Sequence, residues 1–574
     1  MALPPLPLEI VSKILLYIPL SYLKYFHERL PKGDSLKSII QGEIYGKLVY
    51  VAGNHSDSLE ERENTEAHLV PKYSDIIDDH YVASIEELRA LARRILKAHV
   101  VQMKIIIRTH RTLQTFLDFC NQYPEFISEI PSICVVGEAQ SLRLLTNVIY
   151  WENITHLELI QGEEFTMNLC PPHLEKFSIV FLDQPTQIMK GWPKTLKSIK
   201  IQDARCAKSI LLPDSLQELI CHDSMELWTT YPSSLRLLDL SHSISDVSCI
   251  HIPSQVRDLS LQFCDLKDED LRQIRFPPQL KRLDLKYNSI RSLADVLFPS
   301  SLIMIDVQGC LINRLDDMCL PDGLQELYVG SNQLKSLDNV IFPQLKLLDI
   351  SAKNKDHNIF NFSKVRFPSS LESLLADGHK TKDWSKVTLP IGLKRWTFST
   401  VEDSRYLLFP SNLEVLFIEF PESSQSKFCD LKLPSTLQEI SLHHGVSSDF
   451  HWNLPLLSTM SIKDCKGPIQ FPSSLIELNI QGLCDQMFRN VQLPCGLRKL
   501  TSTYPFAKYP ESLTDLEVHL PGNKYSEIPR GLRRVQHPPQ LRPSLEQKFP
   551  GIPILDATSS DLNEYFNTAE IDWS

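Results

Sequence analysis

A proline recurs at a nearly constant spacing over about two thirds of this 574-residue chain, and this feature constrains the fold more than any other. The mean interval between successive prolines of the series is about 21 residues. The series consists of Pro171, Pro193, Pro213, Pro232, Pro253, Pro277, Pro299, Pro321, Pro343, Pro368, Pro390, Pro410, Pro434, Pro455, Pro472, Pro494, Pro510 and Pro529. Glycine is sparse, with 19 residues against 38 prolines, so the prolines mark repeated structural positions rather than a disordered segment.

Apolar residues follow each proline at fixed distances, which we number from the proline as +3, +6 and usually +8. One unit places Leu280, Leu283 and Leu285 there, whereas the units at Pro343 and Pro455 are one residue tighter. Positions +6 and +8 alternate with polar neighbours, which is the period of a strand with one buried face. The proline and position +3 form the turn into that strand.

One such unit cannot bury its apolar face alone, but stacked units bury it in a continuous core. The sequence therefore predicts an α/β repeat: a solenoid of about eighteen short units with a parallel sheet on its concave side. We expect only extended or single-turn segments on the outer side, because about 21 residues leave no room for a full helix. A β-sandwich or barrel would instead show strands every 8–12 residues or so.

The pattern resembles the leucine-rich repeat, whose LxxLxLxxN core matches Leu280 to Asn288 and, with Val329 as its second aliphatic residue, Leu324 to Asn332. The resemblance implies a binding surface rather than an active site. The two asparagine amides are expected to satisfy backbone groups where the chain leaves the strand.

The first fifty residues contain an apolar helix that Pro7 begins and Pro19 ends, followed at once by a second short helix. This opening resembles the F-box, which implies that it docks on the Skp adaptor subunit of a cullin–RING ubiquitin ligase. The residues that carry the resemblance are Leu6, Pro7, Glu9, Ile10, Ile14, Ile18, Pro19 and Leu23. After Phe26 the family's pattern is not recognisable. The alternative is a hydrophobic N-terminal cap.

The sequence predicts five regions: an F-box-like helical domain (1–50), a polar linker (51–80), an N-terminal cap of the solenoid (81–150), the repeats (151–537) and a C-terminal tail (538–574). Within the cap, residues 84–98 are predicted to form an amphipathic helix with Ser84 as N-cap. Strands are expected from Met103, Ile133 and Ile154, and a second helix from Thr112.

Nothing in the sequence points to catalysis, a metal or a cofactor. Phosphate-binding, zinc-protease and serine-hydrolase motifs are missing, and no two of the thirteen cysteines have CxxC spacing. Such scattered cysteines are typical of reduced thiols in the cytosol or nucleus. The last cysteine, Cys495, precedes the end of the repeats, which excludes a thiol ligase domain after them. A net charge of −11 argues against nucleic acid or a membrane as partner.

Candidate partner-binding residues flank the buried positions of the strands, at +5, +7 and +9. The predicted acidic band consists of Asp239, Asp258, Asp284, Asp306, Glu326, Tyr328 and Asp349, and exposed apolar groups follow at Leu347, Leu375, Val415 and Phe417. A basic protein would relieve the repulsion within the band, which Arg282 and Lys286 offset in part. The alternatives are a solvated acidic face and apolar groups covered by the C-terminal tail.

These features predict a substrate-recognition subunit of a Skp–cullin–F-box ubiquitin ligase, which binds the adaptor, and through it cullin, at the N-terminus and a target protein on the repeats. A repeat scaffold without ubiquitin-ligase activity is the alternative. An extracellular receptor is disfavoured, because neither a secretory signal nor an apolar stretch of membrane-spanning length is present.

Overall fold

The fold is taken from a computed structural model of the chain. It describes residues 47–52, 81–82, 85–93, 100–107, 113–145, 151–160, 166–182, 189–205, 207–224, 227–228, 230–243, 250–316, 318–352, 362–381, 387–400, 407–420, 431–444, 453–464, 470–482, 492–502, 506, 508–518, 529, 532, 534–537 and 554–556. The F-box-like residues Leu6 to Leu23 lie outside these ranges, as do most of the predicted linker and tail.

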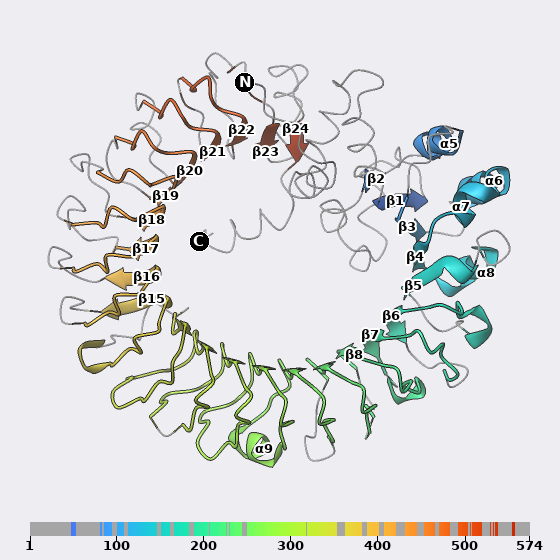
Figure 1. The fold of residues 1–574 in the computed structure, drawn as a ribbon, viewed down its shortest axis with the longest axis horizontal. Helices are drawn as coiled ribbons and strands as arrows, with labels where there is room; N and C mark the ends of the chain where they lie inside the picture. The colour runs from blue at the N-terminus through green and yellow to red at the C-terminus, as the bar shows by residue number, and fades with distance from the viewer. Residues whose placement is uncertain are drawn as a thin grey trace, which may run out of the picture. The chain divides into compact units, whose positions relative to one another are not determined.

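The chain forms two compact units: Met1–Cys264 with Ile274–Leu280, and Asp265–Gln273 with Lys281–Ser574. Within each unit the strands lie edge to edge along one side and the connecting loops along the other (Figure 1). No helix of the described ranges is long and apolar enough to cross a membrane.

The first unit contains a parallel sheet in which β1 pairs with both β2 and β3, and β3 to β10 then pair in chain order. Its strands are β1 (Lys47–Ala52), β2 (Tyr81–Val82), β3 (Gln102–Ile107), β4 (Ser132–Gly137), β5 (Ile154–Leu159), β6 (Lys176–Leu182), β7 (Ser198–Ala204), β8 (Glu218–His222), β9 (Leu237–Asp239) and β10 (Asp258–Ser260).

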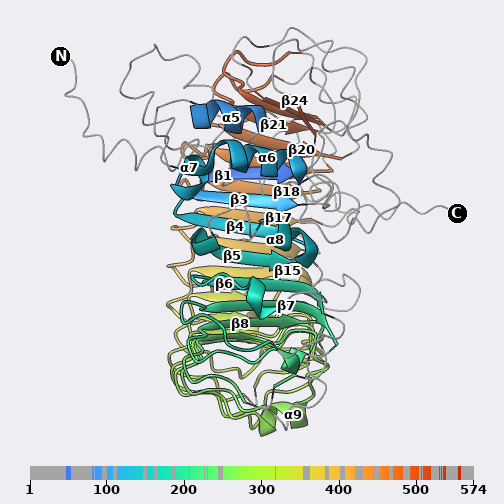
Figure 2. The ribbon, with the colours of Figure 1, turned by 90° about the vertical axis from the view of Figure 1, so that its right-hand side faces the viewer.

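Helices cover the first strands on the side opposite the open face (Figure 2). They are α5 (Ile85–Arg93), α6 (Gln114–Gln122), α7 (Pro124–Ser128) and α8 (Ala139–Leu145). Phe116 of α6 stacks on Tyr50 of β1 with ring centroids 4.9 Å apart, so this helix packs directly on the sheet. The strands predicted from Met103, Ile133 and Ile154 are confirmed, and α5 and α6 lie within the two predicted helices. The predicted N-cap Ser84 and residues 94–98 lie outside the described ranges.

The second unit continues the same construction, and β11 to β24 pair in parallel in chain order. Its strands are β11 (Arg282–Asp284), β12 (Met304–Asp306), β13 (Glu326–Tyr328), β14 (Leu347–Asp349), β15 (Ser373–Thr381), β16 (Arg395–Thr400), β17 (Val415–Glu419), β18 (Glu439–His443), β19 (Thr459–Lys463), β20 (Glu477–Gln481), β21 (Lys499–Ser502), β22 (Asp515–Val518), β23 (Arg534–His537) and β24 (Ile554–Asp556).

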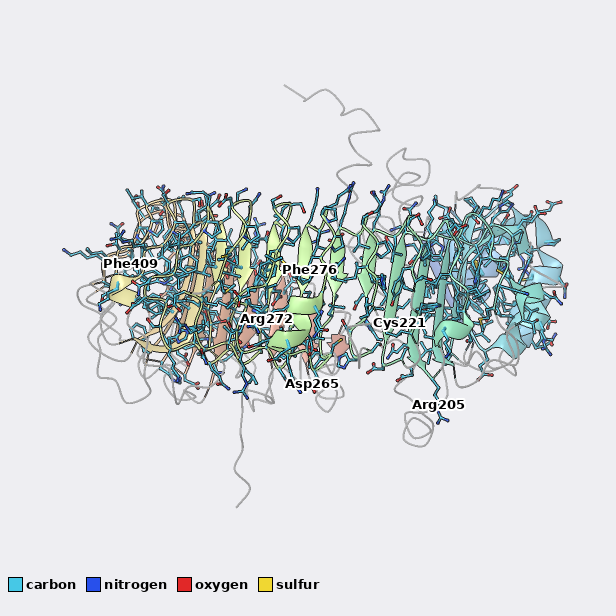
Figure 3. The ribbon with its side chains drawn as sticks, turned by 90° about the horizontal axis from the view of Figure 1, so that it is seen from below. Arg205, Cys221, Asp265, Arg272, Phe276 and Phe409 are labelled. Atoms are coloured by element: carbon cyan, nitrogen blue, oxygen red, sulfur yellow. The ribbon has the colours of Figure 1, made fainter. Side chains whose placement is uncertain are left out.

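Short helical turns occur in the loops. Single 3-10 turns form at Trp151–Asn153, Met167–Leu169, Ala207–Ser209 and Phe362–Lys364, and α9 spans Asp268–Gln273. Arg272 of α9 donates to the carbonyl of Ala294 at 3.3 Å and is labelled in Figure 3. Within the described repeats the loops contain no longer helix, as the length of the unit predicted.

The prolines act through their carbonyl groups. In most coils the backbone N–H of position +3 donates to the carbonyl of the proline three residues earlier. For example, the N–H of Leu280 donates to the carbonyl of Pro277 at 3.1 Å. Proline suits this turn because its φ is preset and the turn uses its acceptor rather than the donor it lacks. The tighter coil at Pro343 closes with the N–H of Leu345 at 2.7 Å.

A hydroxyl at position +2 links successive coils. Thr195 donates to the carbonyl of Leu174 at 2.8 Å, and Ser512 donates to that of Leu497 at 2.6 Å. The same bond is made by Ser215, Ser234, Ser370, Thr436 and Ser474. In these coils the carbonyl of the preceding +3 residue thus finds a donor, which buried backbone requires.

The core consists of the predicted apolar positions. Leu280, Leu283 and Leu285 are fully buried, and so are their equivalents Leu413, Leu416 and Ile418 further along the chain. Because each strand places its +6 residue beside that of its neighbours, the aliphatic side chains form one column through each unit. The predicted solenoid with a parallel sheet is confirmed.

Position +10 of many coils has left-handed backbone. The residues with positive φ there are Asp203, Asp223, His242, Phe263, Tyr287, Gly309, Ser331, Gly378, His444, Asp464 (in the tighter coil) and Gly482. This conformation turns the chain away from the sheet at a small steric cost for residues other than glycine. Glycine is required at position 378, because a Cβ there would lie 2.0 Å from the carbonyl oxygen of Ala352.

Candidate functional site

One face of each sheet is open, and side chains at +5, +7 and +9 point to it. In β13, Leu327 at +6 is fully buried, whereas Glu326 and Tyr328 on either side are half-buried. Strand pairing brings equal positions side by side, about 4.8 Å apart. The +7 row of the second unit therefore runs Asp284, Asp306, Tyr328, Asp349, Leu375, Thr397, Phe417.

Four aspartates of the predicted acidic band, those at position +7, cap their own strands. Each accepts the backbone N–H two residues later, in an Asx turn. The distances from Oδ1 to nitrogen are 3.0 Å for Asp239, 3.1 Å for Asp284, 3.1 Å for Asp306 and 2.9 Å for Asp349. One oxygen of each carboxylate is thus committed to the backbone.

The charge of the band is also partly compensated. Lys286 bridges Asp284 at 3.1 Å and Asp306 at 3.2 Å, and these carboxylates raise the lysine pKa against the opposing effect of burial. Burial raises the pKa of Asp306, which is only 6% exposed. Asp349 is 4% exposed and accepts a hydrogen bond from the side-chain amide of Gln308. The band is therefore less accessible than its composition indicates.

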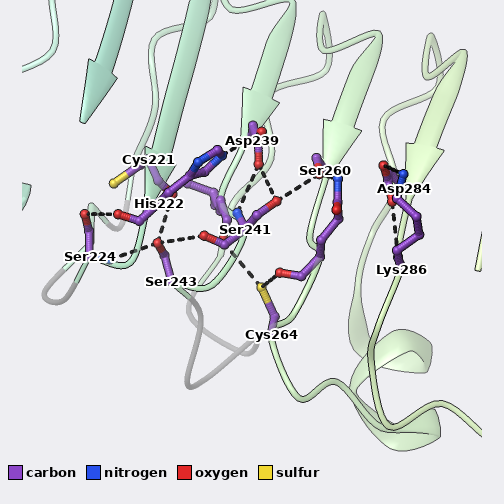
Figure 4. A network of polar contacts seen from close by, with 12 residues as sticks. Cys221, His222, Ser224, Asp239, Ser241, Ser243, Ser260, Cys264, Asp284 and Lys286 are labelled. Atoms are coloured by element: carbon purple, nitrogen blue, oxygen red, sulfur yellow. Dashed lines mark hydrogen bonds and ion pairs between the residues drawn. The ribbon is translucent and has the colours of Figure 1, made fainter. Parts of the chain in front are cut away.

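In the first unit, Asp239 is the centre of a polar network (Figure 4). It accepts from His222 at 2.9 Å and from the Ser241 hydroxyl at 2.5 Å, and Ser241 lies 3.0 Å from the Ser260 hydroxyl. Burial would raise the pKa of Asp239, but these hydrogen bonds hold it below its usual value. Asp258, on the strand after, is half-buried.

This network does not form a catalytic triad. Ser241 and His222 both bond to the carboxylate of Asp239, so the serine hydroxyl points to the acid rather than to the imidazole. A hydrogen bond from the hydroxyl to the imidazole is what activates a serine nucleophile. The arrangement stabilises strand ends instead.

The buried cysteines among the described residues are poor nucleophiles. The described cysteines are free thiols, and most are buried or half-buried. Burial raises the pKa of Cys221 to about 12 and that of Cys310 to about 11, which suppresses the thiolate that nucleophiles and metal ligands need. Among the described residues no three His, Cys, Asp or Glu side chains come together as a metal site.

The apolar candidates lie on the longer strands that follow. Leu375 on β15 and Phe417 on β17 are half-buried, and Thr397 of β16 lies between them. The ring of Phe417 meets that of His443 edge to face with centroids 4.5 Å apart. Leu347 and Val415 lie at +5 of their strands and are half-buried as well.

Two further acids on this face were not among the predicted residues, which lie at positions +5 and +7. Asp377 and Glu419 stand at +9, where Thr397 donates to Asp377 and Ser399 to Glu419, each at 2.8 Å. Burial raises the pKa of Asp377, and the nearby carboxylates of Asp349 and Glu419 raise it further. An acidic residue two places after an aliphatic or aromatic +7 residue is the sequence signal that would have revealed them.

No family model and no curated protein matches this chain. Among solved structures, CroV588, described as a circular leucine-rich-repeat protein, is 17% identical; the match covers 76% of each chain with a TM-score of 0.43. An internalin, InlF, from Listeria monocytogenes is 14% identical over 51% of this chain and 89% of its own, with a TM-score of 0.32. This chain has the leucine-rich-repeat fold. The fold follows from its own strands, core and turns, and its open face is the candidate site.

Proposed function

We propose that this leucine-rich-repeat protein is the substrate-recognition subunit of a Skp–cullin–F-box ubiquitin ligase, acting in the cytosol or nucleus. The observation that carries the proposal is the combination of the Leu6 to Leu23 motif with the open face of the sheets behind it. On that face, rigid strands present polar, acidic and aromatic side chains in rows, which is what recognition of a protein surface requires.

The chain itself does no chemistry in this proposal. The N-terminal motif residues bind the Skp adaptor, and the repeats hold a target protein. Tethering the target raises the effective concentration of its lysines beside the ubiquitin-conjugating enzyme. In the network at Asp239, Ser241 bonds to the carboxylate rather than to His222, and burial raises the pKa of the Cys221 thiol, so neither of these two groups is an activated nucleophile.

The test is co-purification of the adaptor with a Pro7→Ala, Ile10→Asp double variant of the full chain. We expect adaptor binding to be lost, because a charge replaces an apolar contact and the proline that begins the helix is gone. A matched control changes Pro4→Ala and Lys13→Asp, outside the motif, and should retain the adaptor. Circular dichroism and thermal unfolding check that both variants keep the solenoid.

Unchanged adaptor binding in the motif variant would refute the tethering role. Recovery of the adaptor without cullin, and no change in the lifetime of any partner on deletion of the gene, would favour the alternative of a repeat scaffold without ligase activity.

A further inference from the structure

Three side chains of the +7 row form a stepped surface on the second unit. Leu375, Thr397 and Phe417 lie in register on three adjacent strands, and all three are half-buried. The threonine side chain is shorter than its two neighbours, and neighbouring strands are about 4.8 Å apart. The side chain over β16 is therefore the shortest of the three. We call this position over Thr397 the step, and Leu375 and Phe417, about two strand spacings apart, its walls.

Aromatic contacts on the opposite face of β16 and beside Phe417 hold the side chains of the step in place. On the opposite face of β16, Trp396 and Phe398 stack at 4.0 Å and are almost fully buried. The wall at Phe417 is fixed by the edge-to-face contact with His443. A surface that is already ordered loses little conformational entropy when a ligand binds.

Carboxylates border the step where the strands end. Asp377 and Glu419 stand at +9 on β15 and β17, with Ser399 between them on the middle strand. Hydroxyl groups of Thr397 and Ser399 donate to these two acids and orient them. Opposite them, at the start of β16, lies the exposed Arg395. Among the described side chains, the border of the step thus carries two carboxylates and one guanidinium group.

We propose that β15–β17 form a docking surface for a segment of a partner protein that carries an apolar side chain next to a lysine or arginine. The apolar side chain packs over Thr397 between Leu375 and Phe417, and the cation meets Asp377 and Glu419. This inference rests on the proposed role of the open face in holding a protein.

Charge complementarity selects this occupant over the chain's own C-terminus. Residues 557–574 contain four acidic and no basic residues, so they would add negative charge beside Asp377 and Glu419. A basic segment relieves the repulsion between these carboxylates and gains from the partly desolvated setting.

The experiment selects a phage-displayed library of random 12-residue peptides on the full-length protein, its Thr397→Arg variant and its Thr501→Arg variant. Arginine at 397 fills the step and supplies the cation itself. Thr501 is a matched control, because it occupies +7 of β21 and donates to Glu517 at 3.2 Å, as Thr397 does to Asp377. A synthetic consensus peptide is then measured by fluorescence anisotropy.

We expect the wild type and the Thr501→Arg variant to enrich peptides with an aliphatic or aromatic residue beside Lys or Arg. Binding of the consensus peptide should weaken at least tenfold with Thr397→Arg and fall as salt is raised. Enrichment of no such peptides by the wild type, or equal binding to the Thr397→Arg variant, would overturn the proposal. Displacement by a synthetic peptide of residues 557–574 would assign the surface to the chain's own tail and overturn it as well.

Adaptor co-purification separates this inference from the proposed function. The Thr397→Arg variant keeps its N-terminal motif, so it should still bring down the Skp adaptor. If the wild type binds the adaptor but no peptide of the expected kind, the docking surface is wrong while the ligase role stands. If the wild type binds such a peptide but not the adaptor, the docking surface stands and the ligase role is wrong.

Discussion

Two stretches of the second unit share one core but end their strands differently. Strands β11 to β14 are three residues long, whereas β17 to β20 each have five. Three of the four short strands have aspartate at +7, and the long ones have Phe417, Ser441, Ser461 and Asn479 there. In these two stretches, aspartate at +7 therefore accompanies short strands, and other residues at +7 accompany the longer ones.

The reason is competition for one backbone donor. In the short strands the Asp Oδ1 accepts the N–H of position +9, as between Asp306 and Gln308. That donor is then lost to the ladder, so the regular strand pairing ends there, although the N–H of position +10 still donates to the next coil, as that of Tyr287 does to the carbonyl of Gln308 at 2.9 Å. Without the carboxylate the ladder continues to +9, as between Glu419 and His443. The capped stretch binds its own acids to its backbone, and the uncapped stretch leaves its side chains for a partner.

The largest expected effect tests whether the two stretches really share one core. Leu283→Ala and Leu416→Ala should each lower the free energy of unfolding by about 2–5 kcal/mol, because each opens a cavity at a fully buried position. Leu408→Ala, at a side chain that is 80% exposed, should change it little. Urea unfolding measures all three. A loss in only one of the two stretches would show that their cores differ.

Removal of a cap has the next largest effect. Asp306→Ala should cost about 1–2 kcal/mol, because the N–H of Gln308 loses its acceptor and Lys286 loses one of its two carboxylate partners. Asp306→Asn keeps an acceptor oxygen without a buried charge and should lose less. Ser441→Ala, at the same position of a long strand, should stay within about 0.5 kcal/mol. Urea unfolding again decides, and equal losses for alanine at 306 and 441 would refute the capping role.

The smallest effect concerns the pH dependence of β15, the strand that follows the capped stretch and carries Leu375 rather than aspartate at +7. The folded-state pKa of Asp377 is raised above its ordinary 3.8, mainly by burial, so ionised Asp377 costs stability. That cost is absent below pH 3.8, grows as the pH rises to the folded-state pKa and is constant above it. Asp377→Asn should therefore be more stable than the wild type at pH 7, and the difference should shrink towards pH 3 in thermal unfolding.

Glu372→Gln is the control of opposite sign. The hydrogen bond from Lys394 lowers the pKa of Glu372, so its contribution is present at neutral pH and disappears as the pH falls through the folded-state pKa. This variant should be slightly less stable than the wild type at pH 7 and match it in acid. The same direction of change for both variants would contradict the assignment.

Much of the fold could be predicted because position +6 and the proline leave few alternatives. The asparagine expectation is also confirmed: Asn332 donates to the carbonyl of Val329 at 2.9 Å and accepts from the N–H of Ile312 at 2.9 Å. The hydrogen bonding of the +7 aspartates could not be predicted, because an aspartate at the end of a strand can either face solvent or accept from its own backbone. Only the dihedral angles after the strand decide between these. The left-handed backbone at +10 could not be predicted either, because Phe263 and Tyr287 occupy it in place of the glycine that usually indicates this conformation.

In most coils the turn closes on a proline carbonyl, and this separates the register of the sheet from the length of the loops. The interval between successive prolines ranges from 16 residues, ahead of Pro510, to 25, ahead of Pro368, and α9 falls within the 24 residues that follow Pro253. Evolution can thus add or remove residues between a strand and the next proline without shifting any aliphatic column. Such a protein can acquire new contacts on its outer loops while its inner rows stay in place.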